Sequence, residues 1–265
     1  MPDSKGRLSI ILYGLRFSQL PYEAKLSKLR AIGYRSIQGG LVTELTNEEH
    51  KSLLDGLGME MSCLAGGLEE LQKDPAPYLR CCHAFGLDEI MIGAMPVENR
   101  ADYNGYLRAI DRINQTARIL KQEGVYLSYH NHAQEFRRFP NGIRGMDLLY
   151  EALDPDATRF LLDTHWIQAG GGDILYWLEK CRGRIRCLHI KDYRIAPANF
   201  ATGIGSTHKQ FAAIGRGNLP WRDIVDTALA AGIRSFIVEQ DYTYGEDPYD
   251  CAAQSFETMR ALGIS

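Results

Sequence analysis

Hydrophobic and polar positions repeat along this chain in a fixed order: an amphipathic helix pattern, a glycine, and then a short apolar stretch. The order occurs five times, with the glycines at Gly33, Gly58, Gly86, Gly124 and Gly232. Glycine after a helix can adopt the left-handed conformation that ends the helix, and the chain then turns into the next strand. The repeat therefore predicts helices and strands that alternate along the sequence.

Eight short apolar stretches fit the strand pattern. They are residues 8–13, 35–38, 59–63, 89–92, 125–130, 159–164, 186–190 and 236–240. The helices expected between them include residues 21–31, 47–57, 102–122, 146–153 and 221–230. Strict alternation indicates a parallel sheet, and eight repeats predict an α/β fold, a closed (β/α)8 TIM barrel that forms a single domain over residues 1–265. A doubly wound open sheet is the alternative, but no glycine-rich phosphate loop follows the first strand.

The last four predicted strands carry polar residues at positions that face the barrel interior. Side chains alternate along a strand, so apolar positions such as Leu127 and Tyr129 leave the other set to point inward. The inward polar residues are Ser128, His130, His132, Asp163, His165, His189, Lys191, Glu239 and Asp241. Burying an ionised group without a partner costs several kcal/mol, and a cation between carboxylates and imidazoles would remove that cost.

A metal site is the interpretation that explains these residues together. Asp163, His189 and Glu239 suit one divalent metal ion such as Mn²⁺, Mg²⁺, Zn²⁺ or Co²⁺. Each residue alone also has a structural alternative: an inward histidine can be a hydrogen-bonded core group, a strand-end aspartate can cap a helix, and Lys191 can pair with Asp192 at the surface. Their coincidence on four successive strands favours a site at the barrel end where such enzymes place their chemistry.

Composition and charge narrow the functional classes. The chain has 265 residues, 45% of them hydrophobic, and a formal net charge of −3, which gives no indication of binding to nucleic acid or to a membrane surface. The apolar run at residues 8–15 is too short to cross a bilayer and lacks a signal-peptide cleavage site, so a cytoplasmic location is expected. The six cysteines form no CxxC pair, and we expect reduced core residues.

Several motifs resemble those of the xylose isomerase-like TIM-barrel superfamily, the sugar phosphate isomerase/epimerase family. They are Tyr129-His130-Asn131-His132-Ala133-Gln134-Glu135-Phe136, Leu162-Asp163-Thr164-His165-Trp166, Leu188-His189-Ile190-Lys191-Asp192, Gly215-Arg216-Gly217-Asn218-Leu219-Pro220-Trp221 and Ile237-Val238-Glu239. The resemblance implies a Glu/Asp/His/Glu metal site, in which Asp163, His189 and Glu239 hold matching positions. On the fifth strand His130 replaces the glutamate of the epimerases. Glu135 is the nearest candidate for the fourth ligand, and His130 is the alternative.

The resemblance also implies an enzyme that acts on a small sugar or polyol. The first hypothesis is a metal-dependent isomerase or epimerase that removes a proton beside a metal-bound carbonyl and stabilises the resulting enediolate. A lyase or dehydratase that acts on a keto-sugar or inosose through the same proton abstraction is the alternative. A nuclease of the AP endonuclease type would need several metals and a basic surface. Gln38, which stands where many relatives carry a glutamate, leaves the substrate open.

Individual roles follow for the inward residues. We expect His130 to be the general base, because a histidine beside a cation stays neutral and can accept a proton at pH 7. Glu239 is the second candidate for the base, and a simple core hydrogen bond is the alternative role for His130. The residues expected to contact substrate are His132, His165, Lys191 and Arg216. Residues 192–219 are expected to form a long loop that could pack on a partner in a homo-oligomer.

Overall fold

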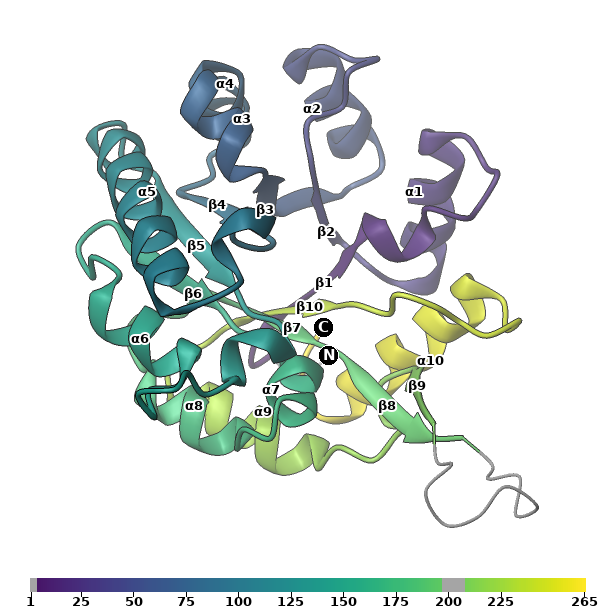
Figure 1. Ribbon diagram of the computed structural model, residues 1–265. Coiled ribbons are helices and arrows are strands. Elements are labelled where there is room, and N and C mark those ends of the chain that lie inside the picture. Colours follow the sequence, from purple (N-terminus) through teal and green to yellow (C-terminus); the bar gives the residue numbers. More distant parts are fainter. Residues whose placement is uncertain (1–3, 197–207) are drawn as a thin grey trace.

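The computed structural model, which describes residues 4–196 and 208–265, has helices arranged around a central ring of parallel strands (Figure 1). The strands pair in the order β6-β5-β4-β3-β2-β1-β10-β7. The ring closes between β6 and β7 through parallel bridges that join Phe160 to Ile185 and Asp163 to His189. The structure confirms the predicted (β/α)8 barrel.

All eight predicted strands are present in the barrel, within a few residues of their expected bounds. They are β1 (Arg7–Ile11), β2 (Ser36–Gly39), β3 (Glu60–Gly66), β4 (Glu89–Ile92), β5 (Tyr126–His130), β6 (Thr158–Leu161), β7 (Cys187–Ile190) and β10 (Ser235–Val238). The helices around them are α1 (Tyr22–Ile32), α2 (Asn47–Gly56), α3 (Leu68–Lys73), α4 (Ala76–Phe85), α5 (Tyr103–Gln122), α6 (Gly145–Ala152), α7 (Thr164–Ala169), α8 (Ile174–Lys180), α9 (Trp221–Ala230) and α10 (Pro248–Ala261). Short 3-10 helices are η1 (Leu12–Leu15), η2 (Val97–Asn99) and η3 (Ala133–Phe136). Within residues 4–196 and 208–265, no helix has the length and apolar character needed to cross a membrane.

Side chains alternate between the two faces of the strands as predicted. A small apolar layer fills the barrel interior and consists of Ile11, Cys63, Met91, Leu161, Cys187 and Ile237. Outward residues such as Leu127 and Tyr129 belong to the larger core between strands and helices. The five glycines predicted to end helices all have positive φ, from 62° at Gly58 to 131° at Gly33. All six cysteines are buried and free, as expected.

Two segments differ from the prediction. The sixth strand ends at Leu161 rather than at residue 164, because Asp163 caps α7 and accepts a hydrogen bond from the Trp166 amide at 2.8 Å. The stretch 192–219 was expected to be irregular, but it contains an antiparallel hairpin of β8 (Asp192–Ile195) and β9 (Lys209–Ala212). Residues 197–207 of the predicted loop lie outside the described residues.

Candidate active site

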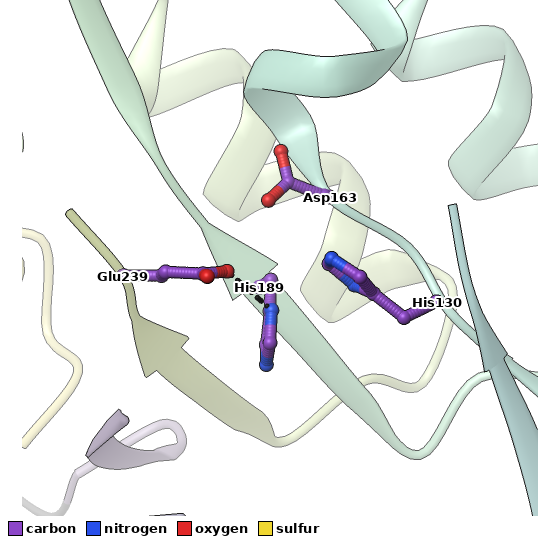
Figure 2. Close-up of side chains that lie close together, drawn as sticks. All are labelled: His130, Asp163, His189 and Glu239. Carbon is purple, nitrogen blue, oxygen red and sulfur yellow. Dashed lines mark ion pairs between the residues drawn. The ribbon is translucent and has the colours of Figure 1, made fainter. Parts of the chain in front are cut away.

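Four side chains from neighbouring strands meet at the C-terminal end of the barrel (Figure 2). His130 ends β5, Asp163 follows β6, His189 lies on β7, and Glu239 follows β10. One potential ligand atom from each residue lies within 4.8 Å of those from the others, and all four residues are buried. The structure thus brings His130 together with Asp163, His189 and Glu239, the three residues that the sequence grouped.

The two histidines are oriented by hydrogen-bond acceptors on the side away from the cluster. Nδ1 of His130 lies 3.2 Å from the carbonyl oxygen of Leu161, and Nε2 of His189 lies 2.5 Å from Oε1 of Gln38. Because both partners are carbonyl oxygens, these two nitrogens carry the protons and donate them. The lone pairs therefore remain on His130 Nε2 and His189 Nδ1, as in histidines that bind metals.

The centre of the cluster holds three buried atoms without a hydrogen-bond partner among the described residues: Asp163 Oδ2, His189 Nδ1 and Glu239 Oε2. His189 Nδ1 and Glu239 Oε2 are 2.7 Å apart, a separation at which two acceptors repel unless a proton or a cation lies between them. Unpartnered buried polar atoms cost free energy and need an explanation. Two imidazole nitrogens and two carboxylates are a donor set that fits a divalent ion of borderline hardness.

Lys191 lies beside the cluster and is 1% exposed. Its Nζ is 3.3 Å from Asp163 Oδ2, 3.2 Å from Glu239 Oε2 and 3.0 Å from Asp241 Oδ2. The alternative in which Lys191 pairs with Asp192 at the surface is therefore wrong. Three carboxylates and one ammonium leave two formal negative charges, which one divalent cation would balance.

Burial and neighbouring charges shift the pKa values of the cluster. Burial raises the pKa of Asp163 to about 6, against the opposing effect of Lys191. Burial also acts to raise the pKa of Glu239, but the ammonium of Lys191, together with the neighbouring His189, outweighs it and holds that pKa well below its usual value. Burial lowers the pKa of His130 well below its usual range, and the neighbouring His189 lowers it further. Ionised carboxylates and neutral imidazoles are the forms that bind a cation.

Glu135, expected as the fourth ligand, does not join the cluster. Its Oε1 accepts hydrogen bonds from the Tyr129 hydroxyl at 2.8 Å and from Gln134 Nε2 at 3.1 Å, and its Oε2 accepts one from the His132 amide at 2.7 Å. Because Tyr129 belongs to the core between strands and helices, these bonds hold the carboxylate on the outer side of β5. His130 takes its place beside the other three residues.

A cavity of about 650 Å³ opens over the cluster, a size that suits a small molecule. Its lining includes His130, His132, His189, Glu239 and Asp241 together with the aromatic residues Trp166 and Phe211. Burial lowers the pKa of His132 to about 4, so this histidine is neutral at pH 7. Its Nδ1 has no hydrogen-bond partner in the described part of the chain. Because His132 lines the cavity, its neutral ring is placed to contact a ligand.

Three other expected substrate-binding residues lie outside the lining of this cavity: Lys191, which is paired with the carboxylates described above, His165 and Arg216. His165 is 4% exposed and packs edge-on against Trp166, Tyr193 and Phe211. Burial lowers the pKa of His165 to about 4. Arg216 is exposed on the loop between β9 and α9. The structure does not bring any of the three into the wall of the cavity among the described residues.

The loop that carries Arg216 is organised by Asp192, a buried residue whose part in it the sequence did not reveal. The Asp192 carboxylate accepts hydrogen bonds from four backbone amides and one indole N–H, at 2.7 to 3.3 Å; the donors are Tyr193, Gly215, Gly217, Leu219 and Trp221. A Cβ at residue 217 would collide with Asp192. In the motif around Arg216, the glycines and the tryptophan therefore have a structural role, because they bind the Asp192 carboxylate.

The sequence also missed residues that shape the cavity. Phe211 reaches it from β9, a four-residue strand in a stretch that was read as loop. Asp241 was assigned to the inward face but received no role. Trp166 stands beside Asp163 and His165 in a motif that was singled out for its polar residues. Residues 209–212, Lys-Gln-Phe-Ala, show no alternation of apolar and polar positions, so the sequence carries no periodic signal for β9.

Comparison with known proteins finds similarity to proteins that are named as enzymes. The chain is 28% identical over 163 residues to an inosose dehydratase from Geobacillus thermodenitrificans (strain NG80-2). The aligned region covers 57% of this chain and 52% of the relative. It is 27% identical over 202 residues to an inosose dehydratase from Bacillus licheniformis. The aligned region covers 66% of this chain and 64% of the relative. The aligned part of the chain thus spans about half to two thirds of the length of these relatives.

Among solved structures, a sugar phosphate isomerase/epimerase from Parabacteroides distasonis ATCC 8503 has a TM-score of 0.76 at 20% identity, over 98% of this chain and 95% of that one. At this identity the likeness shows the shared fold. The model of xylose isomerase-like TIM barrels matches residues 26–262. Because the match includes all of the barrel after the first strand, the chain belongs to the xylose isomerase-like TIM barrel family.

Proposed function

We propose that this chain is a metal-dependent enzyme that acts on a small polyhydroxylated ketone. The proposed ligands of one divalent ion are His130, Asp163, His189 and Glu239. The observation that carries the proposal is the convergence of buried atoms from Asp163, His189 and Glu239 that have no hydrogen-bond partner among the described residues and whose negative charge one ammonium balances only in part. When bound there, the ion would act as a Lewis acid that polarises the substrate carbonyl and acidifies the adjacent C–H.

Glu239 is the proposed general base. His130 was the first candidate from the sequence, but its free Nε2 faces the cluster and is proposed here as a ligand atom. Glu239 has Oε2 within the cluster and also lines the cavity. A carboxylate with one oxygen near a cation can move a proton with the other. His132 lines the cavity, and its neutral ring is proposed to contact a substrate hydroxyl and so orient the substrate.

Loss of water is the reaction proposed on this site. Two relatives are named inosose dehydratases, and loss of water next to a carbonyl can begin with abstraction of the proton adjacent to that carbonyl. Isomerisation or epimerisation is the second candidate, because it needs the same first step and a group that returns the proton. Glu239 and His132 both line the cavity and are the two groups placed for that return. The two reactions differ in the fate of the intermediate and are separated by their products.

The test combines product analysis with metal content. The metal-loaded protein is incubated in D₂O with ketoses, keto-sugars and inososes, and the mixture is followed by NMR and mass spectrometry. A dehydratase gives a product lighter by one water, whereas an isomerase or epimerase gives deuterated product of unchanged carbon and oxygen content. Absence of both C–H exchange and product with every substrate in the panel would contradict the proposal.

A matched pair of variants tests the ligand set. We expect His130→Ala to lower metal content and Glu135→Gln to retain it, because only His130 has a ligand atom in the cluster. Metal content is measured by mass spectrometry after gel filtration in chelator-free buffer. Retention of the ion by His130→Ala together with its loss from Glu135→Gln would return Glu135 to the ligand set and His130 to the role of base.

A further inference from the structure

Arg16 follows η1 and lines the same cavity as the cluster. It is the one lysine or arginine among the described lining residues. Its Nη1 donates a hydrogen bond to the carbonyl oxygen of Tyr13 at 2.9 Å, and its Nη2 donates one to that of Asp241 at 2.8 Å. These bonds tie the guanidinium to the segments that follow β1 and β10, two adjacent strands of the barrel.

Three aromatic rings surround this guanidinium. Cζ of Arg16 is 4.0 Å from the ring centroid of Tyr13, 4.4 Å from that of Phe17 and 5.0 Å from that of Tyr242. Aromatic rings over a guanidinium attract its charge and leave its N–H groups free at the edge of the plane. Arg16 is therefore held in position before any ligand arrives, which lowers the entropy cost of binding.

The charge of Arg16 is not balanced by a neighbouring carboxylate. No carboxylate among the described residues lies within 4.0 Å of it, and the side chain of nearby Asp241 pairs with Lys191 at 3.0 Å. Lys191, by contrast, is paired with three carboxylates. A guanidinium has five N–H donors, and Arg16 uses two terminal nitrogens on backbone carbonyls. Donors and a net positive charge therefore remain available at the cavity wall.

We propose that Arg16 binds an anionic group, a carboxylate or a phosphate, at the end of the substrate away from the reacting carbonyl. This inference rests on the proposed function and narrows its substrate to an anionic keto-sugar or keto-polyol. The planar fork of arginine matches the oxygens of both groups. An inosose is uncharged, so the substrate of this chain differs in charge from the one named for its relatives.

Calorimetric binding to the metal-loaded protein tests this with three probes: neutral fructose, fructose 6-phosphate and 5-ketogluconate. We expect at least one anionic probe to bind about 10- to 100-fold more tightly than fructose, the range for hydrogen bonds to a charged group. The phosphate and carboxylate probes distinguish the two sources of charge. Arg16→Met is expected to remove the preference for the anionic probes over fructose, and Arg16→Lys to keep part of it. Arg118→Met, which removes the same charge from exposed α5, is the matched control.

Equal or undetectable binding of all three probes by the parent would overturn the proposal, as would a preference that persists in Arg16→Met. Equal weakening of all three probes by Arg16→Met would assign the residue a structural role between the two loops. The proposed reaction fails independently: an anion preference without any C–H exchange would remove the reaction and leave the role of Arg16. C–H exchange without a preference for the anionic probes would remove the proposed role of Arg16 and leave the proposed reaction.

Discussion

The two ends of the barrel both bury carboxylates, but they balance the charge in different ways. At the N-terminal end, Glu89 is fully buried on β4, and its Oε2 lies 3.2 Å from Nη1 of Arg159. Asp88 forms ion pairs with Arg159 and with Arg186. Two carboxylates therefore face two guanidinium groups, and the protein cancels this charge by itself.

At the C-terminal end the charges do not cancel within the protein. Asp163, Glu239 and Asp241 share the single ammonium of Lys191. A group of buried charges that is complete contributes to the fold, whereas one that is incomplete at a cavity indicates a place for a ligand. The comparison teaches that the balance of charge, rather than burial alone, separates the two networks.

The largest expected effect is on the incomplete network. Asp163→Ala and Glu239→Ala should lose the divalent ion and slow turnover by about 10³-fold, because each removes a ligand and an electrostatic contribution to the transition state. Metal analysis and kcat measure the two effects. Full retention of the ion by both variants would show that the C-terminal network is complete without a cation, and the comparison would fail.

The second largest expected effect is a loss of stability when the charge-balanced network at the N-terminal end is broken. Arg159→Met leaves Glu89 buried beside no guanidinium at hydrogen-bond distance, so we expect the free energy of unfolding to fall by about 3 kcal/mol while metal content is unchanged. Urea unfolding measures the loss. Arg7→Met is the control, because it removes an exposed pair with Glu60 that contributes about 1 kcal/mol or less. A variant that keeps its stability but loses turnover would reverse the roles of the two ends.

A third prediction concerns pH, because four of the seven histidines, His130, His132, His165 and His189, lie at the C-terminal end of the barrel. Burial lowers the pKa of His165 to about 4, whereas in the unfolded chain it is about 6.5. The unfolded state therefore takes up the proton first, and stability is lost as the pH falls from about 6.5 to about 4. We expect this one histidine to account for roughly 2 kcal/mol at pH 5, and His165→Phe to remove that part. Unfolding by urea at pH 7.5 and at pH 5 compares the variant with the parent, and an equal acid loss in both would contradict the prediction.

The smallest effect sharpens the role of Lys191. Because its Nζ lies 3.3 Å and 3.2 Å from oxygens of two proposed ligands, its charge opposes that of a bound cation. Lys191→Met should therefore tighten divalent binding about tenfold, as measured by competition with a chelating dye. Weaker binding would show instead that Lys191 holds the two carboxylates in place and matters more for geometry than for charge.

The barrel was predictable because its signals are local and repeated. Each helix-ending glycine and each apolar stretch can be recognised within a few residues, and closure of the ring follows from their number. Convergence of Asp163, His189 and Glu239 was also predictable, since parallel strands of a barrel end at one mouth. The sequence order alone therefore placed three of the four clustered residues together.

The remaining features depend on contacts that spacing does not reveal. His130 and Glu135 stand five residues apart in one motif, and the choice between them depends on hydrogen bonds from Tyr129 and Gln134 that hold Glu135 outside the barrel. Likewise, Asp192 accepts hydrogen bonds from donors 23 to 29 residues away, which makes the loop around Arg216 a folded unit rather than a free arm.

The apolar layer inside the barrel limits how water, protons, substrates and products can reach the cluster. The layer lies beneath the cluster and consists of Ile11, Met91, Leu161 and Ile237 with two cysteines. A layer without strong hydrogen-bonding groups offers no relay for water, protons or ions. Everything that the chemistry consumes or releases must therefore pass through one opening. An enzyme attached to a solid support by its N-terminal face would keep that opening clear, and the same attachment by the opposite face would stop exchange with the solution.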